Sequence, residues 1–262
     1  MKYGCNFSHE LLEILEENSD FCDYIKIGAF GDTFLFMEKA LSKKPLLIHG
    51  FGWYERAGME DLSVLDFRYM NKSILAYQSP WIGFHALMFE KDFCPSPFLR
   101  MKENLKRIQE NLEVPLLIEN MDYSPYYSYE TTLKTTVEAD FINKLVKEVD
   151  CGFLLDVSHA KVSAWQLDQD IYAYLEQLPL EKLREIHFSG AEFREGEGFH
   201  DRHSEMSQED YLIAEYLGHL NKKNLFPQLE IITLEYGSLS SQQKTDKEAI
   251  QRQMKCLKAI FG

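Results

Sequence analysis

Histidine and carboxylate side chains are concentrated in one short stretch, residues 186–203. The stretch contains His187, His200, Asp201 and His203, although the whole chain has only eight histidines. Imidazole and carboxylate groups bind transition metal ions, so this density predicts a metal site. Alternate residues of an extended segment share one face, and Asp201 and His203 can therefore point at one ion. The position of His200 does not fit this spacing, and it is not among the expected ligands.

The same residue types follow apolar segments elsewhere in the sequence. One apolar run ends at Asp156 with His159 close behind, and another ends at Glu235. A lone histidine or glutamate at such a place is usually a hydrogen-bonded core residue. Successive strands that all end this way instead favour a metal site, because an unpaired buried carboxylate is costly. The residues at the ends of six expected strands are His49, His85, Glu119, Asp156, His187 and Glu235.

Eight apolar strand candidates alternate with helical segments along the chain. The expected strands are Lys2–Phe7, Cys22–Phe30, Pro45–His49, Trp81–His85, Pro115–Glu119, Phe153–Asp156, Arg184–Phe188 and Ile231–Leu234. The expected helices are Ser8–Asn18, Asp32–Leu41, Met59–Lys72, Phe98–Leu112, Thr131–Glu148, Asp170–Gln177, Ser207–Lys222 and Thr245–Phe261. This alternation predicts an α/β fold, a (βα)8 TIM barrel that forms a single domain over residues 1–262.

The barrel prediction makes one site of residues that are far apart in sequence. In a (βα)8 barrel the carboxyl ends of all strands surround one shallow bowl, which is where such enzymes keep their chemistry. Adding His159, Asp201 and His203 from the connecting segments to the six strand-end residues makes nine candidate ligands. One transition metal ion binds about four to six ligands, so the set predicts two or three ions.

Composition excludes several classes of protein. The chain has 262 residues, 45% of them hydrophobic, and a net charge of −14, which disfavours binding to nucleic acid or to anionic membranes. Its five cysteines include no C-x-x-C pair and fit reduced thiols in a cytoplasm. The N-terminal segment lacks an apolar signal core, and no run approaches the roughly 20 apolar residues of a membrane helix. We therefore expect a cytoplasmic protein without a membrane span.

With these residues identified, the sequence resembles the xylose isomerase-like barrel superfamily over nearly its whole length. Two of its groups have a similar ligand set: the endonuclease IV group of apurinic-site nucleases, and the multinuclear non-heme iron-dependent oxidative enzymes typified by the methanobactin-biosynthesis oxidase. Four motifs resemble the oxidative group: L-D-V-S-H-A-K-V-S-A at 155–164, I-H-F-S-G at 186–190, D-R-H at 201–203 and L-I-E-N at 117–120. His159 is a departure, because many oxidative members have Asn there and the nucleases have His.

The resemblance implies a grouping of the nine ligands. His49 and His85 would hold one ion together with a bridging Glu119. A second ion would be held by Glu119, Asp156, His187 and Glu235, which are also the expected catalytic residues. The third would be held by His159, Asp201 and His203. Iron is the expected metal, with zinc or manganese as alternatives.

The oxidative resemblance implies an iron enzyme that uses dioxygen and modifies cysteine-containing ribosomal peptides. A peptide or small-molecule substrate is expected, with a partner protein that presents the leader of the peptide. A zinc-dependent phosphodiesterase would need a basic collar, whereas the strand-end loops carry mainly acidic residues such as Glu60 and Asp122. A sugar isomerase or epimerase would use the four expected catalytic residues and leave the other five ligands unexplained. A purely structural site would be closed and rich in cysteine.

Overall fold

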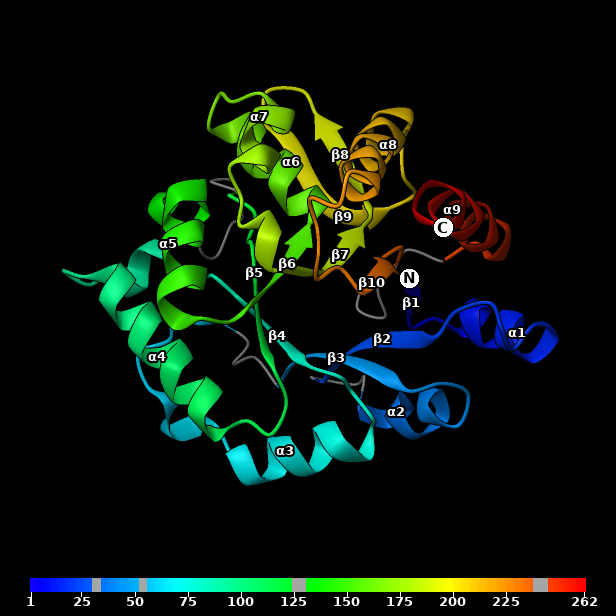
Figure 1. Cartoon of the computed structure of the whole chain (residues 1–262), viewed down its shortest axis with the longest axis horizontal. Helices are drawn as coiled ribbons and strands as arrows, with labels where there is room; N and C mark the ends of the chain where they lie inside the picture. The colour runs from blue at the N-terminus through cyan, green and yellow to red at the C-terminus, as the bar shows by residue number, and fades with distance from the viewer. Residues whose placement is uncertain (30–33, 52–55, 124–130, 238–244) are drawn as a thin grey trace.

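A computed structural model of the whole chain describes five segments of it, residues 1–29, 34–51, 56–123, 131–237 and 245–262. In these segments, eight strands close into a barrel of the order β1-β10-β7-β6-β5-β4-β3-β2, in which every neighbouring pair is parallel (Figure 1). Parallel neighbours require a crossover between consecutive strands, and helices supply it here. The predicted (βα)8 barrel is confirmed, while a single domain over 1–262 stays a prediction.

All eight barrel strands lie where the sequence predicts them, within a few residues. The final residue of the expected strand Cys22–Phe30 lies outside the described residues. The strands are β1 (Lys2–Asn6), β2 (Tyr24–Ala29), β3 (Leu46–Phe51), β4 (Ile82–His85), β5 (Leu116–Glu119), β6 (Gly152–Asp156), β7 (Leu183–Phe188) and β10 (Ile231–Leu234).

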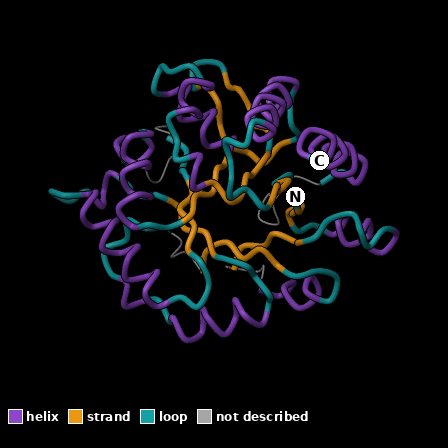
Figure 2. Tube along the Cα trace, in the orientation of Figure 1, coloured by secondary structure: helices purple, strands orange, loops and turns teal. Residues whose placement is uncertain are grey.

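The helices form a ring around the strands (Figure 2). The α-helices are α1 (His9–Glu17), α2 (Phe34–Leu41), α3 (Phe67–Ala76), α4 (Pro97–Asn111), α5 (Ala139–Val149), α6 (Val157–Gln166), α7 (Ile171–Glu176), α8 (Gln208–Lys222) and α9 (Lys247–Phe261). Short 3-10 helices lie at Leu62–Val64, Glu90–Asp92, Lys134–Val137 and Leu180–Lys182. The predicted start of the second helix, Asp32, lies outside the described residues.

Two predicted helices begin later in the structure than in the sequence analysis. The helix expected from Met59 begins at Phe67, because the Asp66 side chain accepts a hydrogen bond from the backbone N–H of Tyr69 and caps it there. The helix expected from Thr131 begins at Ala139. Before it, the chain forms a 3-10 turn in which the Thr136 hydroxyl donates to the Leu133 carbonyl.

One α-helix and one β-hairpin were not predicted. Helix α6 follows β6 without a loop, and the Asp156 carboxylate caps it by accepting the backbone N–H of His159. After β7 the chain forms an antiparallel hairpin, β8 (Gly190–Arg194) and β9 (Gly198–Ser204), which lies outside the barrel at the top of Figure 1. Asp201 and His203, which were expected in an extended segment, lie on the second strand of this hairpin.

The interior of the barrel is filled in layers by alternate strand residues. One layer is apolar and consists of Leu47, Trp81, Leu117, Leu154 and Ile231. Because every second residue of a strand faces the same side, the residues two positions further on lie above this layer at the carboxyl end. Three of them are His49, Glu119 and Asp156. The apolar layer thus forms the floor of the predicted site.

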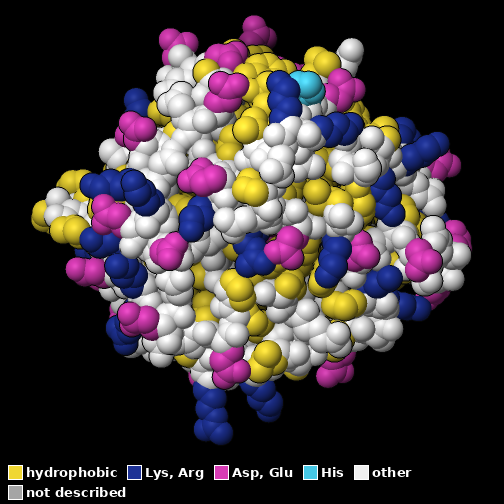
Figure 3. All heavy atoms as spheres, in the orientation of Figure 1, with side chains coloured by type: hydrophobic (Ala, Val, Ile, Leu, Met, Phe, Trp, Pro, Cys, Tyr) yellow, Lys and Arg dark blue, Asp and Glu magenta, His cyan; other side chains and the backbone are white. Residues whose placement is uncertain are grey.

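The surface and the helices add two further observations. On the face shown in Figure 3, Lys and Arg side chains are interspersed with Asp and Glu side chains. Among the described helices, none has the length and apolar character that crossing a bilayer requires.

Candidate metal centre

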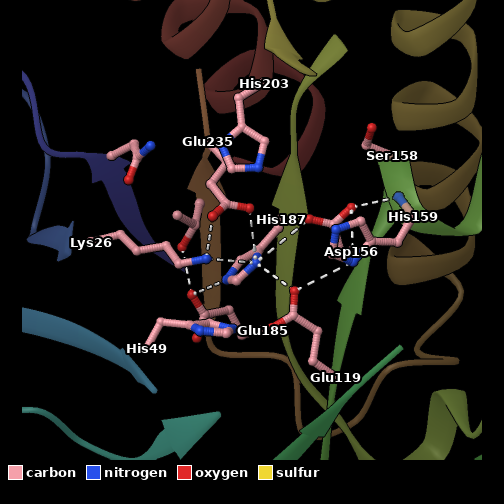
Figure 4. A network of polar contacts seen from close by, with 12 residues as sticks. Lys26, His49, Glu119, Asp156, Ser158, His159, Glu185, His187, His203 and Glu235 are labelled. Carbon is pink, nitrogen blue, oxygen red and sulfur yellow. Dashed lines mark hydrogen bonds and ion pairs between the residues drawn. The ribbon is translucent and has the colours of Figure 1, made fainter. Parts of the chain in front are cut away.

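The six predicted strand-end residues converge at the carboxyl end of the barrel. Figure 4 shows five of them, His49, Glu119, Asp156, His187 and Glu235. Strand register brings them together: His85 is aligned with Glu119 on neighbouring strands, and Asp156 is aligned with His187. Five of the six are buried, and His85 is partly exposed. A buried assembly of imidazoles and carboxylates requires a compensating charge, which a bound cation would supply.

The first ligand group consists of His49, His85 and Glu119. His49 Nε2 is in contact with Glu119 Oε2, and His85 Nε2 lies 3.6 Å from the same oxygen. The two imidazole rings are tilted with their centroids 4.7 Å apart. One ligand atom from each residue lies within 4.8 Å of the others, a spacing that suits a single ion.

The second ligand group consists of Glu119, Asp156, His187 and Glu235. His187 Nδ1 lies 3.5 Å from Glu119 Oε1, 3.8 Å from Asp156 Oδ2 and 3.3 Å from Glu235 Oε2. Ligand atoms of Glu119, Asp156 and His187 lie within 4.8 Å of one another. Glu119 therefore belongs to both groups, with Oε2 facing the first and Oε1 facing the second.

The third ligand group consists of His159, Asp201 and His203, and the hairpin carries two of its members. The Nε2 atoms of His159 and His203 lie 3.6 Å and 3.1 Å from the same oxygen, Asp201 Oδ2. The Ser158 hydroxyl donates to the other oxygen of Asp201 at 2.8 Å. The structure thus brings all nine predicted residues into one region. Their role as metal ligands stays a prediction.

A sequence profile of the family described as "RiPP precursor modification enzyme MbnB/TglH/ChrH" matches residues 10–221 of the chain. RiPP denotes a ribosomally synthesised and post-translationally modified peptide. The chain belongs to this family. The matched segment contains eight of the nine predicted ligands and ends before Glu235. Membership confirms the resemblance to the oxidative group that the four motifs indicate.

Relatives of this MbnB/TglH/ChrH family member are similar over part of their length. A UPF0276 protein of Pseudomonas aeruginosa is 33% identical over 69% of this chain and 63% of its own length. A UPF0276 protein of Psychromonas ingrahamii is 30% identical over 59% of this chain and 57% of its own. The chain therefore spans less than two thirds of either relative.

The fold has solved counterparts. A xylose isomerase domain containing protein from Salmonella typhimurium superimposes with a TM-score of 0.65 over 99% of this chain and 97% of its own, at 12% identity. At this identity the likeness shows the fold alone, and it confirms the xylose isomerase-like barrel for this family member.

Glu185 supports the second ligand group and was not predicted. It lies two residues before His187 on the same face of β7, and its Oε1 lies 3.0 Å from His187 Nε2. The same carboxylate accepts from Thr233 Oγ1 at 2.7 Å and from Trp81 Nε1 at 2.7 Å. A carboxylate on Nε2 fixes the tautomer that has its proton there, which leaves the Nδ1 lone pair for an ion. Burial would raise the pKa of Glu185, but His187 and Lys26 lower it.

Lys26 is the other residue that the sequence analysis missed. Its ammonium nitrogen contacts Glu235 Oε1 and lies 3.0 Å from His187 Nδ1. Burial would lower the pKa of Lys26, but the carboxylates of Glu235, Glu119 and Glu185 raise it. The signal in the sequence is that Lys26 is the one charged residue of β2. A charged side chain on a buried strand is rarely found without a partner, so it indicates a polar site.

Asn120 holds the third ligand group close to the second. Its side chain makes two 2.9 Å hydrogen bonds with the backbone of Asp156, one to the carbonyl and one from the N–H. The backbone carbonyl oxygen of Asn120 lies 2.9 Å from His159 Nδ1, and this contact orients Nε2 of the His159 ring toward Asp201. The predicted E-N motif thus joins a ligand to a residue that orients two further ligands.

The pKa values of the site residues are shifted in opposite directions. Burial would raise the pKa of Glu119, but His49 and His85 hold it well below its usual range. Burial raises the pKa of Asp156 to about 7, with His159 opposing and Glu235 and Asp201 adding to the shift. Neighbouring carboxyl groups that cannot all ionise together need a cation or a proton between them.

Two buried atoms test whether a metal fits these residues. In the described part of the chain, Asp156 Oδ2 and His203 Nδ1 have no hydrogen-bond partner. His203 also has a φ of 48°, a left-handed conformation that is strained for a histidine. The donors are oxygen and imidazole nitrogen without sulfur, a set suited to iron, zinc or manganese. Residues and metal are therefore compatible.

His200, which was left out of the predicted ligands, is turned to a different partner. Its Nε2 lies 2.9 Å from Glu197 Oε2 on the same hairpin.

Proposed function

We propose that the protein is a multinuclear iron enzyme that uses dioxygen to modify a cysteine-containing RiPP precursor peptide. The observation that carries the proposal is the position of Glu119. Its two oxygens face two different ligand groups, each with atoms close enough to share an ion. A carboxylate shared in this way lets two ions divide their charge.

The ligand assignment follows the three groups. His49, His85 and Glu119 would hold one ion, the second ligand group another, and the third ligand group a third. Iron bound by carboxylates and imidazoles supplies one-electron chemistry with dioxygen. Zinc or manganese remain the alternatives for the same donors.

The residues of the chain would orient and enclose this chemistry. Glu119, Asp156, His187 and Glu235 are the proposed catalytic residues, because they surround the most deeply buried part of the site. The more exposed ligand side chains are His203, Asp201 and His85, with exposed fractions of 26%, 13% and 12%, so substrate would approach from the side of these residues. The floor of apolar side chains would keep water out from below.

A peptide substrate is supported by the family description and by the charge of the chain. The family modifies RiPP precursors. A net charge of −14 favours association with a basic peptide. We propose that a partner protein presents the peptide leader, which pull-down of the chain with a candidate precursor would test. A precursor that binds and reacts equally well without any partner would contradict the proposed role of the partner protein.

The first experiment is metal analysis of protein purified without air, by mass spectrometry, followed by iron spectroscopy before and after oxygen. Two or three irons per chain and an oxygen-sensitive signal are expected. Zinc or manganese alone, with no oxygen response after iron loading, would overturn the oxidative proposal and favour hydrolysis or sugar isomerisation. Glu197→Ala is the control for loss of a carboxylate outside the three groups, because Glu197 lies on the hairpin and contacts His200. This variant should keep the metal content of the wild type.

A further inference from the structure

Lys26 lies inside the second ligand group, where a metal cation would also have to be. Its side chain has an exposed fraction of only 6%, and it contacts one carboxylate and one imidazole of that group. Figure 4 shows the ammonium group reaching from β2 toward Glu235 and His187. A lysine buried at this point is therefore a cation built into the site.

The contact with His187 creates a competition. Each neutral imidazole has one ring nitrogen with a proton and one with a lone pair. Glu185 occupies the Nε2 side of His187 at 3.0 Å, so Nδ1 bears the lone pair. Lys26 Nζ lies 3.0 Å from that atom. A metal ion would need the same lone pair, because only the unprotonated nitrogen ligates.

The contact with Glu235 has the same character. One oxygen of this carboxylate contacts Lys26, while the other lies 3.3 Å from His187 Nδ1. Together with Glu119, Asp156 and Glu185, the buried carboxylates of this region repel one another when no cation is present. The ammonium group reduces that repulsion from the side of Glu235, whereas the first ligand group has two imidazoles, His49 and His85, beside Glu119 Oε2.

We propose that Lys26 is a displaceable internal cation. In the metal-free protein its ammonium group neutralises the second ligand group. When that group binds an ion, the ammonium group releases His187 and keeps Glu235, a movement that the flexible lysine stem permits. The second ligand group is consequently loaded more weakly than the first. This inference rests on the metal-binding part of the proposed function and not on its redox chemistry or substrate.

The test is a zinc titration of metal-free protein against a competing chelator, together with thermal unfolding of the metal-free protein. Lys26→Met keeps an unbranched side chain that is one atom shorter and removes the charge. We expect the Kd of the second ligand group to fall at least about tenfold, because a competing cation is removed. We also expect the Tm of the metal-free protein to fall by about 4 °C or more, because the carboxylates lose their counter-charge.

Controls separate charge from packing. Lys26→Arg keeps the charge and should keep the weak second site. Lys26→Gln removes the charge and keeps a hydrogen-bond donor, so it should behave like Lys26→Met if that variant fails to fold. Lys161→Met is the matched buried lysine: its ammonium group lies 2.8 Å from both Glu209 and Asp210, so its loss should lower Tm without changing the zinc affinity of the second ligand group.

The outcomes distinguish this inference from the proposed function. Unchanged or weaker zinc binding at the second ligand group in both Lys26→Met and Lys26→Gln would overturn it, since Lys26 would then only support Glu235. If the wild-type protein itself binds no second ion, the multinuclear proposal fails first.

Discussion

The first two ligand groups and the third are built on different foundations. The members of the first and second lie on barrel strands or directly after one, and each barrel strand is hydrogen-bonded to a neighbour on both sides. The side chain of His187 is fully buried. The third takes two of its three members from a two-stranded hairpin outside the barrel. There Asp201 and His203 have exposed side-chain fractions of 13% and 26%. The barrel preorganises two sites, while the third depends on how the hairpin docks.

An aromatic cluster decides that docking. Trp165 on α6 contacts the rings of Phe193 and Phe199 edge-on, with centroids 5.4 Å and 5.5 Å away. Lys161, also on α6, lies over the Phe199 ring at 4.3 Å. The same helix is capped by Asp156 at the end of β6 and carries His159, so it links the barrel to the hairpin. Loss of these contacts should affect the third ligand group first.

Replacing Glu119 should have the largest effect, because this residue joins the two barrel-borne groups. Glu119→Ala is expected to remove more than one ion per chain and to abolish turnover. Metal content by mass spectrometry is the measurement. Glu119→Gln, which keeps the shape without the charge, should lose metal as well. Metal content equal to that of the wild type in Glu119→Ala would refute a shared carboxylate.

Replacing Asp201 should have a smaller effect that stays in the hairpin-borne group. Asp201→Ala is expected to cost at most one ion per chain, because His159 and His203 both approach the oxygen that is removed. Metal analysis with Arg202→Ala as the control on the same strand measures it. A loss of two or more ions would show that the groups do not load independently.

The dependence on docking can be tested at two glycines of the hairpin. A Cβ at Gly198, where φ is 90°, would lie 2.3 Å from Trp165 Nε1, whereas a Cβ at Gly196, where φ is 83°, has nothing within 4 Å. Gly198→Ala should therefore move the hairpin and weaken zinc binding by the third ligand group about tenfold. This factor corresponds to about 1.4 kcal/mol of binding free energy. Gly196→Ala carries the backbone strain alone and should leave zinc affinity nearly unchanged. Equal effects would mean that strain and not docking matters.

The smallest expected effect is a pH dependence of the metal-free protein. Burial would lower the pKa of His203, but Asp201 and Glu235 raise it to about 9. A histidine whose pKa is raised on folding stabilises the fold fully below its unfolded value of about 6.5, and this contribution is lost as the pH rises through about 9. Tm should thus fall between pH 6.5 and 9, and His203→Ala should flatten the curve. Zinc affinity at the third site should rise over the same range as protons leave. A wild-type Tm curve as flat as that of the variant would contradict the attribution of this pH dependence to His203.

The elements that the sequence failed to predict have physical reasons. Helix α6 is buried on all sides from Val157 to Ala164, so it lacks the exposed polar face whose spacing reveals most helices in a sequence. The hairpin segment is polar and rich in glycine, which is also typical of loops. Lys26 and Glu185 are charged residues on strands, and only closure of the barrel turns both inward.

The sequence by itself determined the barrel and the nine candidate ligands, because strand periodicity and apolar runs are local properties and every ligand follows directly from them or from a short motif. Which ligands approach the same carboxylate oxygen depends on contacts between residues that are distant in sequence. The resemblance implied that Glu119 belongs to two groups. Only the tertiary structure decided which of its oxygens faces each group, that Glu185 orients His187 and that Lys26 enters the site, because these contacts depend on how the closed barrel directs the side chains inward.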